Sequence, residues 1–138
     1  MKRTLLLVGA SLLFASSAYA TSDEGTFKSV MQKLGGNYNM LNQAILMEDY
    51  DRAAKAANKI ANHDKPSMSQ RMKVMSTLAM DMPNFKKADG KVHKLALQIE
   101  KSAKAKDMKM LIQQQSQMLK ACMACHTTYR RKLIDVLK

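Results

Sequence analysis

Apolar residues recur every three or four positions through most of this 138-residue chain, which is the pattern of helices that each bury one face. The pattern covers residues 24–47, an alanine-rich stretch ending near Asn62, a short stretch over 67–80, and two further long stretches, from Phe85 to Ala103 and from Asp107 to Leu133. No alternating run rich in Val, Ile and Thr predicts a strand. Long amphipathic helices with short connections pack economically as an antiparallel four-helix bundle, so we expect an all-α fold of that kind.

Capping and helix-breaking residues predict where these helices begin and end. The acidic pair Glu48-Asp49 precedes the second helical stretch and Asp107 precedes the last one, and each is expected to provide a cap. Pro66 and Pro83 are expected to interrupt the pattern, with Pro83 ending the short stretch over 67–80. That short stretch has an apolar stripe, which we expect to be buried: Met68, Met72, Met75 and Ala79.

The first 20 residues have the form of a secretory signal peptide. Lys2 and Arg3 precede an apolar run over residues 5–14, and Ala18-Tyr19-Ala20 resembles a signal-peptidase site. Residues 21–138 are therefore expected to form one exported domain, most simply in a bacterial periplasm. No later segment is apolar over enough residues to span a membrane, so the mature chain is not expected to be membrane-spanning.

The net charge of the chain indicates which kinds of partner it could bind. The formal net charge is +12 and stays strongly positive without Lys2 and Arg3, which favours acidic partners or an anionic surface. Nucleic acid is not expected as a partner outside the cytoplasm.

The chain has no Trp, three Phe and four Tyr. Because so few large aromatic residues are available, a bound group could supply part of the core.

Both cysteines of the chain lie in the last helical stretch, in the sequence Cys122-Met123-Ala124-Cys125-His126. On a helix the two thiols are three residues apart and project from the same side, with the imidazole about 100° further round than Cys125. Cys-x-x-Cys-His is the signature of c-type haem attachment, in which the two sulfurs bond to the porphyrin and the histidine ligates the iron. We therefore expect one covalently attached haem c.

Two other roles for the cysteines fit less well. A thioredoxin-like dithiol requires its Cys-x-x-Cys at a helix N-terminus after a strand, whereas this pair lies inside a long helix. A structural zinc site requires four ligands, and His63 and His93 lack suitable spacing to complete one. Export and the position of the motif on the apolar stripe of the helix favour haem.

The leader, the helical pattern and the motif "CMACHTTYR" resemble the class II c-type cytochromes, the cytochrome c-prime family, in which a Tyr-Arg pair follows the haem motif. The resemblance covers the whole mature chain, and "MQKLGGNYNML" also resembles a four-helix b-type cytochrome. It implies Cys122 and Cys125 as thioether anchors and His126 as the proximal iron ligand. The family's homodimers form through the first two helices, and the sequence leaves the oligomeric state open.

The sixth iron position divides the family into two functional types. Members with an apolar residue at one position of the first helix leave the iron five-coordinate and bind nitric oxide or carbon monoxide. Members with methionine there close the site, and the family pattern of "SVMQKLGG" puts Met31 at that position. Gly35 and Gly36, costly in mid-helix, are consistent with close approach of a bulky group nearby or with a helix break. Continued periodicity beyond them favours an unbroken helix.

Methionines other than Met31 could also serve as the distal iron ligand. The chain has 13 methionines, and Met40, Met72, Met75 and Met118 could also reach a bundle interior. Met68, Met72 and Met75 share a helix face, which is compatible with Cu(I) binding but equally with a buried stripe. His63 and His93 are alternative iron ligands in principle, but both lie off the apolar stripes and are expected to be exposed.

The resemblance implies a periplasmic single-electron carrier that is not an enzyme, with His126 and Met31 as iron ligands. Its partners would be periplasmic or membrane redox proteins, among which the positive net charge of the chain favours acidic ones. The alternative is a five-coordinate cytochrome c-prime that binds nitric oxide or carbon monoxide. Phe27 stands where relatives often have a basic residue, which leaves Lys28 or another residue to contact a propionate. Arg130 is expected either near the haem edge or simply at the C-terminal end of its helix.

Overall fold

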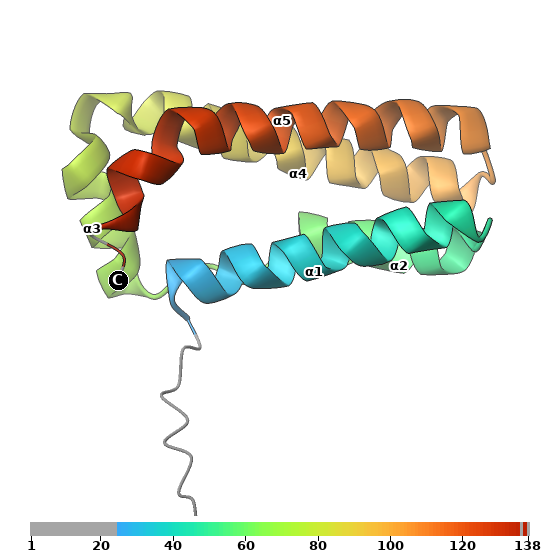
Figure 1. Cartoon of the computed structure of the whole chain (residues 1–138), viewed down its shortest axis with the longest axis horizontal. Helices are drawn as coiled ribbons and strands as arrows, with labels where there is room; N and C mark the ends of the chain where they lie inside the picture. The colour runs from blue at the N-terminus through green and yellow to red at the C-terminus, as the bar shows by residue number, and fades with distance from the viewer. Residues whose placement is uncertain (1–24, 136, 138) are drawn as a thin grey trace, which may run out of the picture.

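The computed structural model describes residues 25–135 and 137, and within them the fold is all-helical (Figure 1). The elements in chain order are α1 (Phe27–Leu46), α2 (Tyr50–Ala61), α3 (Met68–Leu78), a 3-10 turn η1 (Ala79–Asp81), α4 (Met82–Lys104) and α5 (Met108–Ile134). The predicted signal peptide lies outside the described residues. None of the helices in the described part of the chain is both long and apolar enough to cross a membrane.

Side-chain caps fix the start of four of these helices. Thr26, Asp49, Ser67 and Asp107 each accept a hydrogen bond from the backbone N–H three residues further on. Caps of this kind contribute about 1 kcal/mol each, because they satisfy a donor that the helix itself leaves without a partner. The caps predicted from Glu48-Asp49 and from Asp107 are confirmed, and Asp49 is the residue of the pair that accepts the hydrogen bond.

The four longer helices lie side by side and α3 sits at one end of them (Figure 1). Consecutive members of the set α1, α2, α4 and α5 pack closely along their lengths, and each runs opposite to the one before it. The first and the last, α1 and α5, make far fewer contacts with each other. The predicted helical bundle is confirmed, and it is closed on three sides but looser along α1 and α5.

The main core is built largely from small side chains. Ala53, Ala56 and Ala57 of α2 are fully or almost fully buried against larger residues of the neighbouring helices. Because alanine faces let helix backbones approach closely, this part of the bundle needs few aromatic side chains. Close helix packing therefore offers one explanation for the low aromatic content, and the expected bound group offers another.

A second, smaller core lies at the end of the bundle that carries α3. Its buried residues are Val74 and Leu78 of α3 and Tyr129 and Leu133 of α5. Two partly buried phenylalanines, Phe27 of α1 and Phe85 of α4, pack against it. This cluster holds the N-terminal end of α1 and the C-terminal end of α5 against the same set of side chains.

Two predictions for the α3 region were wrong. The residues of α3 that are buried are Val74 and Leu78, one turn apart, whereas the predicted methionine stripe is exposed. Pattern alone could not choose between these two faces, because both carry apolar residues. Pro83 does not end α3; it lies in the first turn of α4, where its missing N–H is not needed.

Candidate functional site

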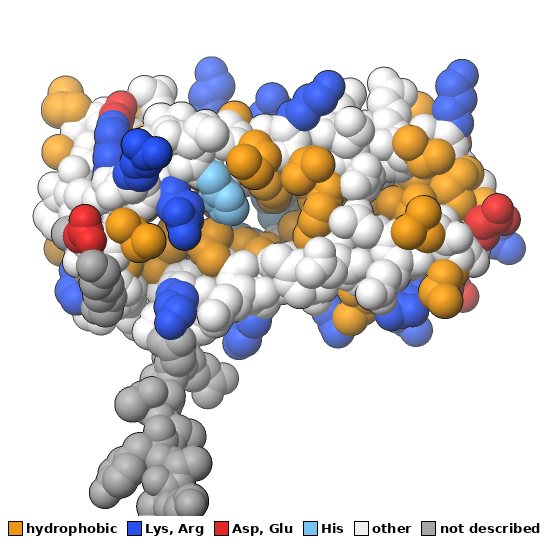
Figure 2. All heavy atoms as spheres, viewed as in Figure 1, with side chains coloured by type: hydrophobic (Ala, Val, Ile, Leu, Met, Phe, Trp, Pro, Cys, Tyr) orange, Lys and Arg blue, Asp and Glu red, His pale blue; other side chains and the backbone are white. Residues whose placement is uncertain are grey.

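The candidate site is the groove between α1 and α5, here called the α1–α5 groove. At one end, Nε2 of Gln115 donates hydrogen bonds to the Tyr38 hydroxyl at 2.7 Å and to Oδ1 of Asn42 at 2.9 Å. At the other end, Phe85 lies 6.2 Å from Phe27 and 5.3 Å from Tyr129, measured between ring centroids. Figure 2 shows this face hollowed between the two helices, with hydrophobic side chains in the hollow and a histidine at its edge.

The hydrogen bond from Gln115 to Tyr38 sets the register of the two helices. Met31 lies seven residues before Tyr38, and Cys122 lies seven residues after Gln115. Since the helices are antiparallel, both steps lead the same way along the bundle, by about 10 Å. Seven residues are also close to two full turns, so Met31 faces α5 and Cys122 faces α1. Met31 and Cys122 therefore stand at the same level on opposite sides of the groove.

His126 extends this arrangement by one turn. It lies eleven residues after Gln115, close to three full turns, so its side chain starts from the same face of α5 as Cys122. Helical side chains lean toward the N-terminus of their own helix. Because α1 and α5 are antiparallel, Met31 and His126 lean toward each other. His126 is exposed and Met31 is half-buried, as expected for groups at the open edge of a groove.

The two cysteines connect the two cores. Cys122 packs against the main core and Cys125 against the second core, and both side chains are half-buried. Burial raises the pKa of both thiols, and the nearby Asp89 carboxylate and Cys122 raise the pKa of Cys125 further. Burial also raises the pKa of Tyr38, with a smaller contribution from Cys122, which agrees with Cys122 facing α1.

These raised pKa values predict that the haem-free protein loses stability in alkali. The thiols and the Tyr38 phenol favour their neutral forms in the folded chain, so this contribution is complete below their ordinary pKa values. It declines as the pH rises above about 9, because the unfolded chain then ionises first. Urea unfolding at pH 7 to 10.5 measures the effect. Replacing both cysteines with alanine should flatten the decline, and an unchanged decline would assign it to other groups.

An exposed apolar rim accompanies the groove along α5. Leu119 and Met123 are 46% and 50% exposed, and helical geometry places both within about 80° of the direction of Gln115. They therefore border the groove on its solvent side. Sequence reasoning missed them because they lie beside the buried stripe of α5, although their spacing of four residues is itself that of one helix face.

Gly35 and Gly36 lie within an unbroken α1, so the alternative of a helix break is excluded. Among the described residues, a Cβ atom added to either glycine would meet nothing within 4 Å. Gly35, three residues before Tyr38, lies on the groove side of α1, whereas Gly36 points away from it. No neighbouring atom in the described part of the chain requires these glycines, and the open space at Gly35 adjoins the groove.

The two glycines offer a matched pair of substitutions. Gly36→Ala should stabilise α1 by about 0.5–1 kcal/mol, because alanine loses less conformational entropy on folding. Gly35→Ala should do the same in the haem-free chain, but should lose this benefit in the haem-loaded protein if a bulky group approaches Gly35. Thermal unfolding of both forms measures the difference. Equal stabilisation of the loaded protein by both substitutions would show that nothing approaches Gly35.

The other two histidines, His63 and His93, each contact protein groups. Nδ1 of His93 is 2.7 Å from the Ala61 carbonyl oxygen, where it meets the end of α2, and the residue is exposed as predicted. The exposure predicted for His63 is confirmed only in part: its side chain is 23% exposed, and its Nε2 lies 3.9 Å from Oδ1 of Asp89 in α4. Both histidines are engaged with protein groups in places that sequence spacing could not reveal.

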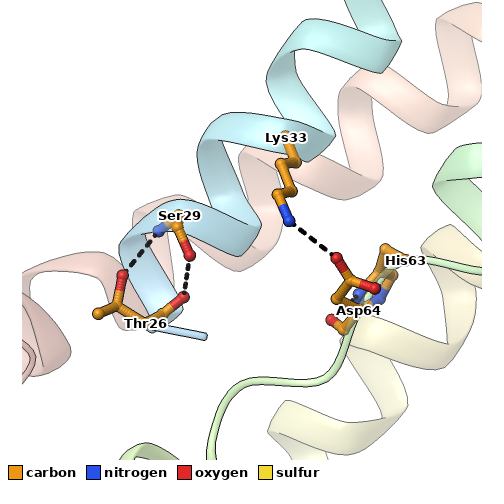
Figure 3. Close-up of polar contacts among 5 residues, drawn as sticks. All are labelled: Thr26, Ser29, Lys33, His63 and Asp64. Carbon is orange, nitrogen blue, oxygen red and sulfur yellow. Dashed lines mark hydrogen bonds and ion pairs between the residues drawn. The ribbon is translucent and has the colours of Figure 1, made fainter. Parts of the chain in front are cut away.

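A polar contact beside His63 connects α1 to the segment after α2. Nζ of Lys33 lies 2.9 Å from Oδ2 of Asp64, and Figure 3 shows this ion pair next to the Thr26–Ser29 cap at the start of α1. The hydrogen bond from Lys33 lowers the pKa of Asp64. Both side chains are largely exposed, so the pair orients the segment more than it stabilises the fold.

Arg130 is exposed on the last turns of α5, and Lys28 is exposed on the first turn of α1. Both lie toward the end of the bundle that carries Cys125 and His126. The lysines that could meet an acidic partner are exposed along α4: Lys86, Lys87, Lys91 and Lys94.

The donor set of the groove is compatible with a covalently held haem. Two half-buried thiols, one exposed imidazole and one half-buried thioether share the groove with an apolar rim and open space at Gly35. Among the described residues, His, Cys, Asp and Glu form no cluster of three or more that could hold a metal ion by themselves. A metal here would need a ligand set completed by a cofactor or by methionine.

No family model matches the chain, and neither the curated proteins nor the solved structures include a significant match. A functional assignment therefore depends on the residues and geometry of the α1–α5 groove.

Proposed function

We propose that this chain is a monohaem c-type cytochrome that carries single electrons, with Cys122 and Cys125 bonded to the haem and with His126 and Met31 as iron ligands. The observation that carries the proposal is the register set by Gln115 and Tyr38, which brings Met31 level with Cys122 and one turn from His126. Of the chain's methionines, Met31 is thereby distinguished by position and not only by the pattern around it.

The residues of the groove would have different roles in holding the haem. Cys122 and Cys125 would fix the group to α5 through two covalent bonds from positions already anchored in the two cores. His126 and Met31 would hold the metal from two different helices, so that its coordination changes little between oxidation states. When bound, haem supplies a reversible one-electron couple, and histidine–methionine ligation raises its reduction potential relative to histidine alone.

The apolar rim would complete the site. Leu119 and Met123 would cover the group on its solvent side and limit the approach of water. A low local dielectric of this kind tunes the reduction potential. The exposed lysines of α4 would favour encounter with an acidic redox protein, and salt would weaken that encounter. The amino-terminal sequence supports maturation and action in the periplasm.

The visible spectrum of the matured protein tests the proposal. We expect sharp low-spin bands in the reduced form and, in the oxidised form, the weak long-wavelength band that marks sulfur ligation of ferric haem. A protein that carries haem but shows a broad high-spin Soret band and binds carbon monoxide readily would instead be a five-coordinate gas-binding cytochrome. A protein that remains colourless after expression with the haem-attachment machinery would overturn the haem assignment itself.

A further inference from the structure

The exposed face of α3 is formed by methionines. Met68, Met72 and Met75 are 64%, 52% and 46% exposed. They occupy positions i, i+4 and i+7, so they lie within about 60° of one another around the helix, with Met72 between the other two along its length. The segment from Met68 to Met82 contains five of the chain's 13 methionines. The three thioethers of α3 are thus concentrated on one surface and are not core filler.

Several contacts hold this methionine face toward solvent. The backbone N–H of Ser67 donates to the Gly25 carbonyl at 2.8 Å, and the N–H of Phe27 donates to Oε1 of Gln70 at 3.2 Å. On another side of the helix, Val74 and Leu78 are buried in the second core. The start of α3 is therefore tied to the start of α1, while its buried face is fixed against α5. The methionine face cannot turn inward without breaking these contacts.

The chemistry of this surface is selective. α3 contains no Asp, Glu, His or Cys, so it offers no oxygen carboxylate, imidazole or thiolate ligand. Thioether sulfur favours soft ions, above all Cu(I), over Zn²⁺, Ca²⁺ or Mg²⁺. Arg71 and Lys73 flank the methionines on the same helix, and their charges repel a divalent ion more than a monovalent one.

We propose that Met68, Met72 and Met75 form a binding site for one soft monovalent metal ion, Cu(I), on the surface of α3. Three thioethers at this spacing can meet one ion because the middle residue lies less than two turns from either neighbour and methionine has three flexible side-chain torsions. The site is separate from the α1–α5 groove and requires no change of oxidation state. It would bind an ion supplied in the monovalent form.

Silver(I) is a suitable probe because it is an air-stable, diamagnetic ion of the same charge and softness. The full-length matured protein would first be treated with an alkylating agent, so that any thiol not bonded to haem cannot bind silver. Methionine methyl groups labelled with ¹³C would then be followed by NMR during titration with silver nitrate in chloride-free buffer. We expect the Met68, Met72 and Met75 methyl resonances to shift together and to saturate at one equivalent.

Substitutions decide whether the three methionines act as one site. The triple variant Met68→Leu/Met72→Leu/Met75→Leu keeps the apolar surface and helix propensity and should bind silver at least about tenfold more weakly. A matched control replaces three exposed methionines on separate elements, Met47, Met80 and Met110, and should bind as the unaltered protein does. The proposal is overturned if the α3 methyls do not shift, or if the α3 triple variant binds silver as tightly as the control.

Discussion

Under the proposed haem ligation, replacing Met31 with leucine should convert a six-coordinate electron carrier into a five-coordinate gas-binding haem protein. Leucine has nearly the same volume as methionine but no sulfur, so the fold should survive at a cost below about 1.5 kcal/mol. The sharp low-spin bands and the long-wavelength sulfur band should be lost. Carbon monoxide should bind readily, and the reduction potential should fall because methionine ligation raises it. Optical titration of the reduced and oxidised protein measures all three changes.

Met40→Leu is the matched control for this substitution. Met40 lies on the same helix and is also half-buried, but two residues beyond Tyr38 it faces nearly away from α5. It packs against the main core and should give an unchanged spectrum. An unchanged spectrum in the Met31 variant as well would remove Met31 from the ligand set and leave the sixth position to another group or to none.

Local sequence signals were sufficient where one residue acts on its own helix. The caps at Glu48-Asp49 and Asp107 were predicted because a carboxylate before an amphipathic stretch satisfies backbone donors within one turn. The stripe on the last helix also corresponds closely to the buried and half-buried residues of α5, including both cysteines. Helix caps and apolar stripes of this kind depend only on the spacing of residues along the chain, so they can be predicted from the sequence.

In the short helix α3, the spacing of apolar residues does not predict which face is buried. Its methionines and its pair Val74 and Leu78 both satisfy a helical stripe, and the choice between them depends on what lies across the bundle. Tyr129 and Leu133, more than 50 residues later in the chain, supply that partner. A local pattern cannot predict a choice made by so distant a segment.

The candidate site includes a feature that local sequence predicts and a feature that depends on a distant contact. The Cys-x-x-Cys-His motif was visible in five residues, whereas the position of Met31 opposite it depends on a hydrogen bond between Gln115 and Tyr38, 77 positions apart. From sequence, Met31 was distinguished from the other methionines mainly by a family resemblance. The register of α1 and α5 gives an independent reason to choose it. The apolar rim at Leu119 and Met123 was missed because it becomes visible only when the groove is seen to be open.

The largest effect is expected when both cysteines are replaced. In the matured, unaltered protein, Cys122 and Cys125 should give no reactive thiols after denaturation under reducing conditions, and the mass should include one haem. The double variant Cys122→Ser/Cys125→Ser should lose all covalently bound haem, so that any remaining colour is extracted by acidified organic solvent. Each single variant should keep one thioether bond and one attached haem. Ala124→Ser, an exposed position between the two cysteines, is the matched control and should behave as the unaltered protein does.

The thiol count also distinguishes haem attachment from a redox-active dithiol. Sulfur held in a thioether cannot exchange with a disulfide, whereas a dithiol would give two reactive groups and no added mass. The raised pKa values of both thiols argue in the same direction, because a thiol-exchange nucleophile needs a lowered pKa to form its thiolate near neutral pH. Two half-buried neutral thiols are poor nucleophiles toward disulfides, which favours their proposed role as thioether anchors. Two reactive thiols in the unaltered, matured protein would reverse this assignment.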